Sequence, residues 1–392
     1  MIIFRHGFSD EGDFTDWTDV ATIMNYPSFF KRLFLLLGII VIAALVPLSP
    51  VAAAPKKIIY YGWSTRDTQY VAKYWQKMET MPFDGVGINV AIARGQPIDT
   101  GNLLAWQVIS PTQFNLSQFQ SAIGDLRLAR WTKFTENFLF GAALSSGYAK
   151  NLNFFDDARW VIVANNMKVV GSIAAQTGLK GLILDPEHYN YSLFNYLDQA
   201  AQYSASFAAY QAKARQRGRQ VMTAIASVFP KAAILSLFGH SLTMRAAQGV
   251  SLDQSEYALL ASFLDGFLEA LPDRAQLIDG YEAAYAFNQL SQFQAAYDEI
   301  KKAIAYSAVP NFYQLKVRAG FGIWPDYYGN VNYRTPAQLQ STITSGLQVS
   351  DKYVWIYSQS VDYFPVSGVY PPPTVPQYYI GAFNAARLAV NK

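Results

Sequence analysis

Short apolar runs alternate with longer amphipathic segments along most of the chain. Eight runs of ten residues or fewer are rich in β-branched or aromatic residues and are flanked by Gly, Pro, Asp or Asn, which is typical of strands. In chain order they are Ile58–Trp63, Gly85–Val90, Asn137–Leu144, Gly181–Glu187, Gln220–Val228, Gln276–Glu282, Leu315–Trp324 and Tyr353–Tyr357. Between them, the spacing of apolar residues predicts helices, most clearly over Asp156–Gly178, Ser192–Gly218, Gln254–Leu271 and Gln292–Ala308.

This alternation predicts an α/β fold, a (β/α)8 TIM barrel with extended βα loops. The segments Ala91–Thr112, Phe229–Asp253 and Trp324–Thr335 are too long for plain connectors, and we expect them to be loops over one end of the barrel. An open doubly wound sheet is the alternative, but the first run is followed by Tyr61–Thr65 and not by a glycine-rich phosphate loop. Residues 55–392 are expected to form this single barrel domain.

Carboxylates and aromatic residues follow the predicted strands at their C-terminal ends, where a barrel carries its active site. The fourth run ends in Asp185, Pro186 and Glu187, followed by His188 and Tyr189. Residues i and i+2 of an extended strand share a face, so Asp185 and Glu187 should look into the same space. A strand buried in a parallel sheet normally stays apolar to its end, so these two acids favour a site over packing.

Glycoside hydrolysis requires two carboxyl groups, one to protonate the leaving oxygen and one to attack the anomeric carbon or activate water. Glu187 and Glu282 are the predicted catalytic pair, assisted by Asp185. We assign Glu187 as the general acid/base and Glu282 as the nucleophile or base, although the sequence alone leaves their order open. The other strand-end residues are expected to bind a carbohydrate substrate: Trp63, Tyr189, Asp279, Tyr281, Trp324, Asp326, Trp355 and Tyr357.

Each of these residues also has a structural interpretation. The glutamates could be salt-bridged acids, Asp185 could cap the loop that follows it, and the tryptophans could be core or rim aromatics. His188 and His240 do not make a metal site, which usually shows several ligands at close spacing, so we expect no metal and no cofactor. Gly141–Gly147 contains no Gly-x-Ser-x-Gly turn, which argues against a serine hydrolase.

Composition supports a carbohydrate ligand and argues against nucleic acid. Aromatic residues make up 15% of the chain and charged residues also 15%, the latter below the roughly 25% usual for soluble domains. Such a surface suits ligands that stack and form hydrogen bonds. The net charge of +3 is small and the basic residues are scattered, so no nucleic-acid partner is expected. The chain has no cysteine, which excludes disulfides, a thiolate nucleophile and a cysteine-based zinc site.

Residues 1–54 are expected to be an N-terminal extension with a signal peptide. A basic flank at Lys31 and Arg32 precedes the uncharged run Leu33–Val46, and the small residues Val51–Ala54 follow, which are the three parts of a secretory signal. A membrane anchor is the alternative, but the run of 14 residues is shorter than the roughly 18 to 25 needed to span a bilayer.

Cleavage near Ala53 or Ala54 would give a secreted or periplasmic protein without stable membrane association. The acidic residues that precede Met24 are unusual in a signal, which makes Met24 a candidate for the true start. The sequence predicts no oligomeric state.

Several short motifs resemble those of secreted bacterial glycoside-hydrolase-like TIM barrels, over about residues 57–365. They are Tyr60–Trp63, Pro82–Gly85, Lys180–Tyr189, Asp279–Glu282 and Val354–Tyr357. The resemblance implies a carbohydrate substrate and acids at the strand ends. The largest clan of barrel glycosidases has Asn-Glu on strand four and a second Glu on strand seven. This chain has Pro186 and Glu187 instead, with no Glu from Leu315 to Tyr333. The chitinase pattern Asp-x-Asp-x-Glu has Ile183 in its first position here.

Two further functions stay open at this level. A polysaccharide lyase would need a base and a group that neutralises a uronate carboxylate, for which Arg318 is a candidate. A non-catalytic carbohydrate-binding barrel would keep the aromatic residues and perform no chemistry.

Overall fold

The computed structural model describes residues 55–189, 191–365 and 375–391. All of them belong to Ala54–Lys392, the second of two units into which the chain divides. The predicted signal peptide and its cleavage site near Ala53 or Ala54 lie outside the described residues. Among the helices of the described residues, none is long and apolar enough to cross a bilayer.

The strands of the described chain form one parallel sheet in the order β7-β6-β5-β4-β3-β2-β1-β9-β8. Their bounds are β1 (Lys57–Tyr60), β2 (Gly85–Ile88), β3 (Phe138–Ala143), β4 (Gly181–Asp185), β5 (Ala233–Ser236), β6 (Gln276–Asp279), β7 (Val317–Ala319), β8 (Phe321–Ile323) and β9 (Tyr353–Ile356).

The sheet closes on itself at Gly320. β7 pairs with β6, and β8 pairs with β9. Only Gly320 separates β7 from β8, so these two short strands together occupy one strand position of the barrel, here called a stave. A β-carbon at Gly320 would meet Ile278 Cγ2 at 2.8 Å and the carbonyl oxygen of Tyr353 at 3.2 Å, so the neighbouring staves approach closely here. The nine strands therefore make eight staves, and the predicted (β/α)8 barrel is confirmed.

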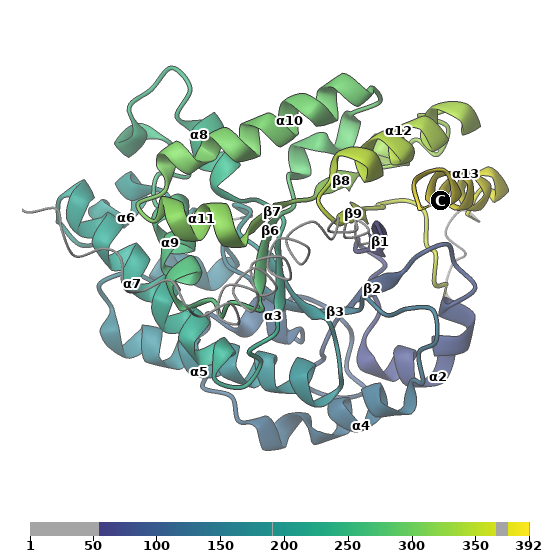
Figure 1. Cartoon of the computed structure of the whole chain (residues 1–392). Coiled ribbons are helices and arrows are strands. Elements are labelled where there is room, and N and C mark those ends of the chain that lie inside the picture. Colours follow the sequence, from purple (N-terminus) through teal and green to yellow (C-terminus); the bar gives the residue numbers. More distant parts are fainter. Residues whose placement is uncertain (1–54, 190, 366–374, 392) are drawn as a thin grey trace, which may run out of the picture. The chain divides into compact units, whose positions relative to one another are not determined.

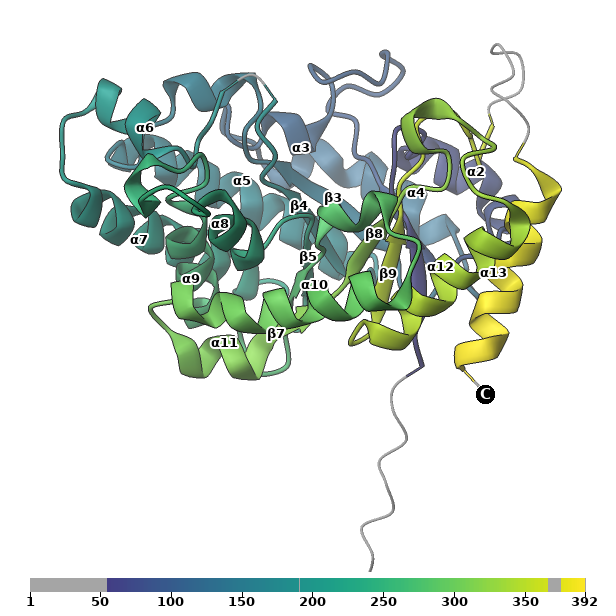
Figure 2. The same cartoon turned by 90° about the horizontal axis from the view of Figure 1, so that it is seen from above.

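Helices follow the strands and surround the barrel (Figure 1). They are α2 (Thr68–Met78), α3 (Leu104–Gln107), α4 (Gln120–Leu128), α5 (Asp157–Gln176), α6 (Tyr196–Gln202), α7 (Phe207–Ala226), α8 (His240–Ala246), α9 (Leu260–Ala270), α10 (Leu290–Lys302), α11 (Pro310–Lys316), α12 (Pro336–Val349) and α13 (Gln377–Val390). α12 and α13 lie side by side in both views (Figure 1, Figure 2). The predicted helix over Asp156–Gly178 is α5, which Asp156 caps by accepting a hydrogen bond from Arg159 N at 3.0 Å.

Alternate residues along the strands face two separate cores, as the period of two requires. Ile59, Ile183 and Ile278 belong to one cluster, whereas their chain neighbours Ile58 and Leu182 belong to the larger cluster shared with the helices. The first cluster fills the inside of the barrel and the second lies between the barrel and its helices. The inside parity continues from Ile183 to Asp185, so the β4 acid points toward the barrel axis.

The predicted fifth strand, Gln220–Val228, is wrong. Residues up to Ala226 form the second half of α7, and the true β5 is the four-residue run Ala233–Ser236 inside the segment expected to be a loop. Val221, Met222 and Ile225 are buried against neighbouring elements, so this half of the helix is as apolar as a strand would be. α8 lies in the same segment, so Phe229–Asp253 contains both a strand and a helix.

Candidate active site

A cavity of about 520 Å³ lies at the C-terminal ends of the strands, the end at which (β/α)8 enzymes carry their active sites. Its walls come from the segments that follow β1, β2, β4, β5, β6, β8 and β9, with Phe140 from β3. The lining residues are Tyr61, Gly62, Trp63, Thr65, Asn89, Ile98, Asp99, Thr100, Leu103, Trp106, Phe140, Asp185, Glu187, Tyr189, Leu237, Glu282, Tyr285, Trp324, Tyr357 and Gln359.

Asp185 organises the end of β4. Its Oδ1 accepts a hydrogen bond from Glu187 N at 2.9 Å, and its Oδ2 accepts one from the Tyr189 hydroxyl. The carboxylate thus closes a local turn around Pro186, which the proline ring stiffens by fixing its own φ. The result is that Asp185, Glu187 and Tyr189 all line the cavity.

A strained turn presents Glu282 at the end of β6. Tyr281 has φ 40° and ψ 63°, a left-handed conformation that is uncommon for a residue with a side chain. The backbone on both sides of it is held, because Gly280 N donates to Ser236 O at 2.7 Å and Glu282 N donates to Leu237 O at 3.2 Å. Strain of this kind is kept where the surrounding structure fixes it, and functional sites are common examples.

The three carboxyl groups share a poorly hydrated environment. Burial raises the pKa of Asp185 to about 7, and the neighbouring Glu187 charge adds to the rise. Burial raises the pKa of Glu282 well above its usual range, and the charges of Glu187 and Asp185 raise it further. Burial also raises the pKa of Glu187. Within the described residues, these carboxyl groups take part in no ion pair.

Unpartnered polar atoms belong to three of the lining residues. Asn89 Oδ1, Glu282 Oε2 and Trp324 Nε1 are buried and have no hydrogen-bond partner within the described residues. Asn89 is 7% exposed and its amide nitrogen is already used, donating to Thr65 O at 3.0 Å. Buried polar atoms normally have partners, so these three are positioned to bind a ligand.

Aromatic rings form the walls. Tyr285 stacks on Tyr357 with ring centroids 5.2 Å apart, and Trp324 meets the Tyr357 ring edge-on at 4.9 Å. Trp106 packs on Tyr189 with centroids 4.8 Å apart. Trp63 is 75% exposed at the rim. Faces and edges of this kind suit the apolar faces of sugar rings.

The structure brings most of the predicted site residues to this cavity. Those that line it are Trp63, Asp185, Glu187, Tyr189, Glu282, Trp324 and Tyr357. Their roles in catalysis or binding stay predictions.

Four residues predicted to bind substrate, Asp279, Tyr281, Asp326 and Trp355, do not line the cavity and are buried. Asp279 Oδ2 accepts from Ser241 Oγ at 2.7 Å, and Trp355 Nε1 donates to Gly280 O at 2.8 Å. The Tyr281 hydroxyl donates to Glu299. Three of the four therefore support the turn that carries Glu282.

Asp326 supports a different loop, the one that follows β9. Its Oδ2 accepts from the backbone nitrogens of Gln359, Ser360 and Val361 at 3.2, 2.6 and 3.0 Å. It thus fixes the segment directly after the cavity residue Tyr357 without reaching the cavity itself.

Several lining residues were not among the predicted site residues. Asn89 is the penultimate residue of the second run, so the same inspection of strand ends identifies it as a polar residue in an otherwise apolar strand. Tyr61 lies two residues before Trp63, and Tyr285 is one turn beyond Glu282. Trp106 lies on α3 in a long loop, where no local pattern distinguishes it.

The two histidines of the described chain lie outside the cavity lining. His188 stacks on Tyr257 with ring centroids 3.8 Å apart, and burial lowers its pKa to about 4. His240 Nε2 lies 3.0 Å from Asp265 Oδ1. A search of the described residues finds no group of three or more His, Cys, Asp or Glu side chains able to hold a metal ion.

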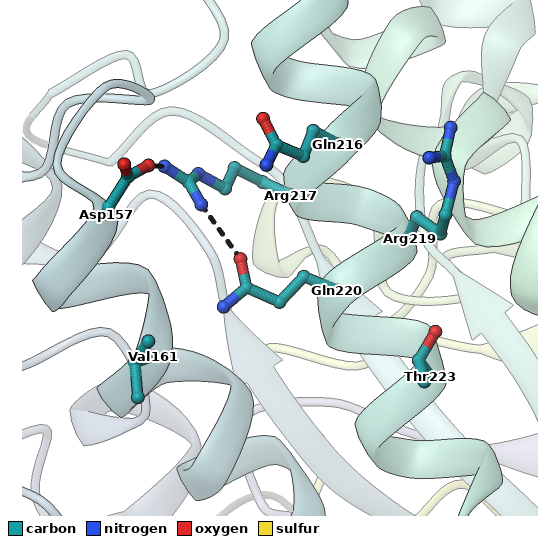
Figure 3. A pocket seen from close by; sticks show the side chains of 7 residues that line it. All are labelled: Asp157, Val161, Gln216, Arg217, Arg219, Gln220 and Thr223. Atoms are coloured by element: carbon teal, nitrogen blue, oxygen red, sulfur yellow. Dashed lines mark hydrogen bonds and ion pairs between the residues drawn. The ribbon is translucent and has the colours of Figure 1, made fainter.

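A second hollow lies between α5 and α7 (Figure 3). Its most buried cation, Arg217, points at Asp157 and Gln220, to which it is bonded. Arg219, also on its wall, pairs with Glu269. Since these cations are already paired, the hollow lacks the unpartnered groups that distinguish the cavity at the strand ends.

No model of a known protein family matches the chain, and no curated protein matches it. Among solved structures, it is similar to an exo-β-1,4-mannosidase from Opitutaceae bacterium strain TAV5, with a TM-score of 0.44 and 14% identity over 86% of this chain and 56% of that chain. It is also similar to an endo-1,4-β-mannanase from Eisenia fetida, with a TM-score of 0.44 and 12% identity over 86% of this chain and 92% of that one.

A third similar structure is the 3-keto-D-glucoside 4-epimerase of E. coli, with a TM-score of 0.39 and 11% identity over 85% of this chain and 99% of that one. The chain spans little more than half the length of the mannosidase structure. The barrel assignment rests on the strand order of the chain itself.

Proposed function

We propose that this protein is an exported glycoside hydrolase that cleaves an oligo- or polysaccharide with a pair of carboxyl groups, Glu187 and Glu282. The observation that carries the proposal is that the ends of β4 and β6 present both groups to one aromatic-walled cavity. Sugar rings stack on such walls, and glycosidic bond hydrolysis requires two carboxyl groups at the scissile bond. Export rests on the N-terminal signal pattern.

Burial and neighbouring charges favour different catalytic roles for the two glutamates. Burial raises the pKa of Glu282 well above its usual range, the charges of Glu187 and Asp185 add to the rise, and a hydrogen bond from Tyr285 opposes it. The pKa of Glu187, in contrast, is raised by burial without an added neighbouring charge. In the free protein Glu282 therefore holds the proton and Glu187 carries the charge. This order favours Glu282 as general acid and Glu187 as nucleophile or base, the reverse of the assignment made from strand position.

The bond changes follow from that assignment. Glu282 gives its proton to the glycosidic oxygen while the bond to the anomeric carbon breaks, so the leaving sugar departs as an alcohol. Glu187 then either forms a bond to the anomeric carbon, which water later hydrolyses, or takes a proton from the attacking water. The first route retains the anomeric configuration and the second inverts it, so NMR of the first-formed product distinguishes them.

The cavity gives the lyase alternative no support. Arg318, the candidate neutraliser of a uronate, lies on β7 and donates to the carbonyl oxygens of Val317 and Leu315 at 2.9 and 2.8 Å. It does not line the cavity.

Replacing each glutamate by glutamine tests the proposal. Glutamine keeps nearly the same shape but exchanges no proton, so Glu187→Gln and Glu282→Gln should each fold normally and lose about 10²- to 10⁴-fold in hydrolysis, while glycan binding persists. Reducing-end release across a panel of polysaccharides measures the loss. Glu256→Gln, which changes an exposed glutamate in the same way, is the matched control.

Dinitrophenyl glycosides separate the two roles, because a leaving group that is already acidic needs no proton. Glu282→Gln should recover most of its rate on them, and Glu187→Gln should not. A folded Glu187→Gln protein with wild-type turnover would exclude this residue from catalysis. A wild-type protein that binds glycans and releases no reducing ends from any of them would favour the non-catalytic barrel.

A further inference from the structure

We infer that the cavity recognises a sugar unit that carries a free ammonium group, an amino sugar that is not N-acylated. The inference rests on the proposed function and names the class of substrate that the site would accept. Its basis is the charge and hydrogen-bonding character of the cavity wall, which is acidic, rich in acceptors and aromatic.

The wall carries negative groups without positive ones. Its ionisable acids are Asp99, Asp185, Glu187 and Glu282, and among the described residues no lysine, arginine or histidine lines it. Carboxylates that are removed from water are normally paired with a cation or neutralised by a proton. Glu187 is the charged glutamate of the proposed pair and has no pairing cation among the described residues, so a cationic ligand would compensate its charge.

The unpartnered atoms match an ammonium group. Asn89 Oδ1 is a buried acceptor that has no partner within the described chain, and the charged carboxylate of Glu187 is an acceptor on the same wall. An ammonium group has three donors and no acceptor, whereas a hydroxyl both donates and accepts. Trp324 Nε1, an unpartnered donor on the same wall, is left for a hydroxyl of the same sugar.

The aromatic walls fit the same ligand. Tyr61, Tyr285 and Tyr357 line the cavity together with the carboxyl groups of Glu187 and Glu282. The rings and the carboxyl groups therefore face one space. The face of an aromatic ring attracts a cation within about 6 Å and also packs against a pyranose ring. A neutral sugar would use the second interaction alone.

Direct binding of monosaccharides tests the inference without requiring turnover. The full-length protein is titrated calorimetrically, at neutral pH and equal ionic strength, with D-glucosamine, N-acetyl-D-glucosamine and D-glucose. Glucosamine should bind about ten- to a hundredfold more tightly than either neutral sugar, the range expected for hydrogen bonds to charged groups. Equal affinity for glucosamine and glucose, or tighter binding of the N-acetyl sugar, would overturn the inference.

A charge variant locates the preference. Glu187→Gln removes the charged glutamate of the pair and should reduce the preference for glucosamine over glucose by about tenfold while leaving glucose affinity within about twofold. Glu256→Gln, an exposed change of the same kind, should leave the preference intact. A preference that survives both Glu282→Gln and Glu187→Gln would place the ammonium group elsewhere and overturn the inference.

The outcomes separate the inference from the proposed function. Hydrolysis of neutral polysaccharides without ammonium preference would overturn the inference and leave the hydrolase intact. Ammonium preference without hydrolysis of any polysaccharide, partially deacetylated chitin included, would support the inference for binding and overturn the hydrolase.

Discussion

At the scale of single residues, Asp185 combines two demands that conflict. It fixes the turn around Pro186 through two hydrogen bonds, and it does so from a position that is 1% exposed. Burying a carboxylate is unfavourable, and burial raises the pKa of this one to about 7. The residue that positions the site is therefore one that weakens the fold when it is charged.

This conflict predicts a pH-dependent gain in stability for Asp185→Asn. Because the folded pKa of about 7 lies above the usual 3.8, the stabilisation from the neutral form is complete below pH 3.8 and is lost as the pH rises through 7. Asparagine does not titrate, so the variant should gain about 2 to 4 kcal/mol relative to wild type between acid and mildly alkaline pH.

Urea unfolding of both proteins at the two pH extremes measures the gain. Asp298→Asn, which alters an exposed aspartate on α10, is the control. A difference between Asp185→Asn and wild type that does not change with pH would show that folding leaves the pKa of Asp185 unchanged.

Trp63 and Trp355, which the sequence predicts alike to bind substrate, should differ in how much their replacement changes the stability of the protein. Trp355→Phe leaves Gly280 O without its 2.8 Å hydrogen bond, which should lower the free energy of unfolding by about 1 to 3 kcal/mol. Trp63→Phe alters a side chain that is 75% exposed, and should change stability by less than about 0.5 kcal/mol.

Thermal melts compare the stabilities of these two variants, and glycan affinity provides a second measurement. Affinity should fall for Trp63→Phe, whose indole lines the cavity. Equal stability loss in both variants would contradict the division between supporting and lining residues.

At the scale of elements, α7 and α9 approach each other through a pair of glycines. A β-carbon at Gly218 would meet Phe263 O at 1.8 Å, and one at Gly266 would meet Arg215 O at 1.9 Å. The two helices lie side by side in both views, and their backbones are in contact at these residues (Figure 1, Figure 2). Any side chain there must separate the helices.

Gly218→Ala should therefore destabilise the protein by about 1 to 3 kcal/mol or more, because the obstacle is backbone and cannot rotate away. Gly381→Ala is the matched control, since a β-carbon at this position in α13 meets nothing within 4 Å. Alanine favours a helix over glycine by about 0.5 to 1 kcal/mol, so the control should be stabilising. Urea unfolding measures both, and a neutral Gly218→Ala would show that the helices can part at little cost.

Most of the strands, but not all of them, could be predicted from the sequence. Seven of the eight apolar runs contain strands, because a fully buried strand is an uninterrupted apolar run. The fifth fails because a longer apolar run, Gln220–Ala226 of α7, precedes the four-residue β5, Ala233–Ser236. The period of two or of 3.6 cannot be distinguished over so few residues, and the burial of α7 is a tertiary property.

Some residues of the site could likewise be predicted from the sequence and others could not. Asp185 and Glu187 were recognisable because acids are unexpected at the end of a buried strand. The roles of Asp279, Tyr281 and Trp355 were not. Asp279 follows the inward-facing Ile278 and therefore faces away from the barrel interior, and Trp355 is buried in the interior cluster, so neither lines the cavity. The left-handed conformation of Tyr281 belongs to the turn after β6 and leaves no mark on the sequence.

At the scale of the whole molecule, the described structure covers less than the full chain. The described structure begins at Pro55 and β1 begins at Lys57, so removing residues 1–54 would remove none of the described elements. Protein purified from its native compartment should begin at Ala54 or Pro55. N-terminal sequencing checks this, and intact residues 24–53 in a washed membrane fraction would instead establish an anchor.

The two ends of the described chain meet. Lys56 N donates to Asn391 Oδ1 at 2.8 Å, Asn391 Nδ2 donates to Lys56 O at 3.1 Å, and Arg387 of α13 reaches Asp84 at 2.7 Å. This meeting point is at the N-terminal end of β1, whereas the cavity lies at the C-terminal ends of the strands. The path of the described polypeptide is therefore almost a closed ring. A short linker could join Asn391 to Lys56, and new ends could be opened in an exposed turn such as 248–251. In such a circular permutant the strands would be synthesised in a different order, while the cavity would stay the same.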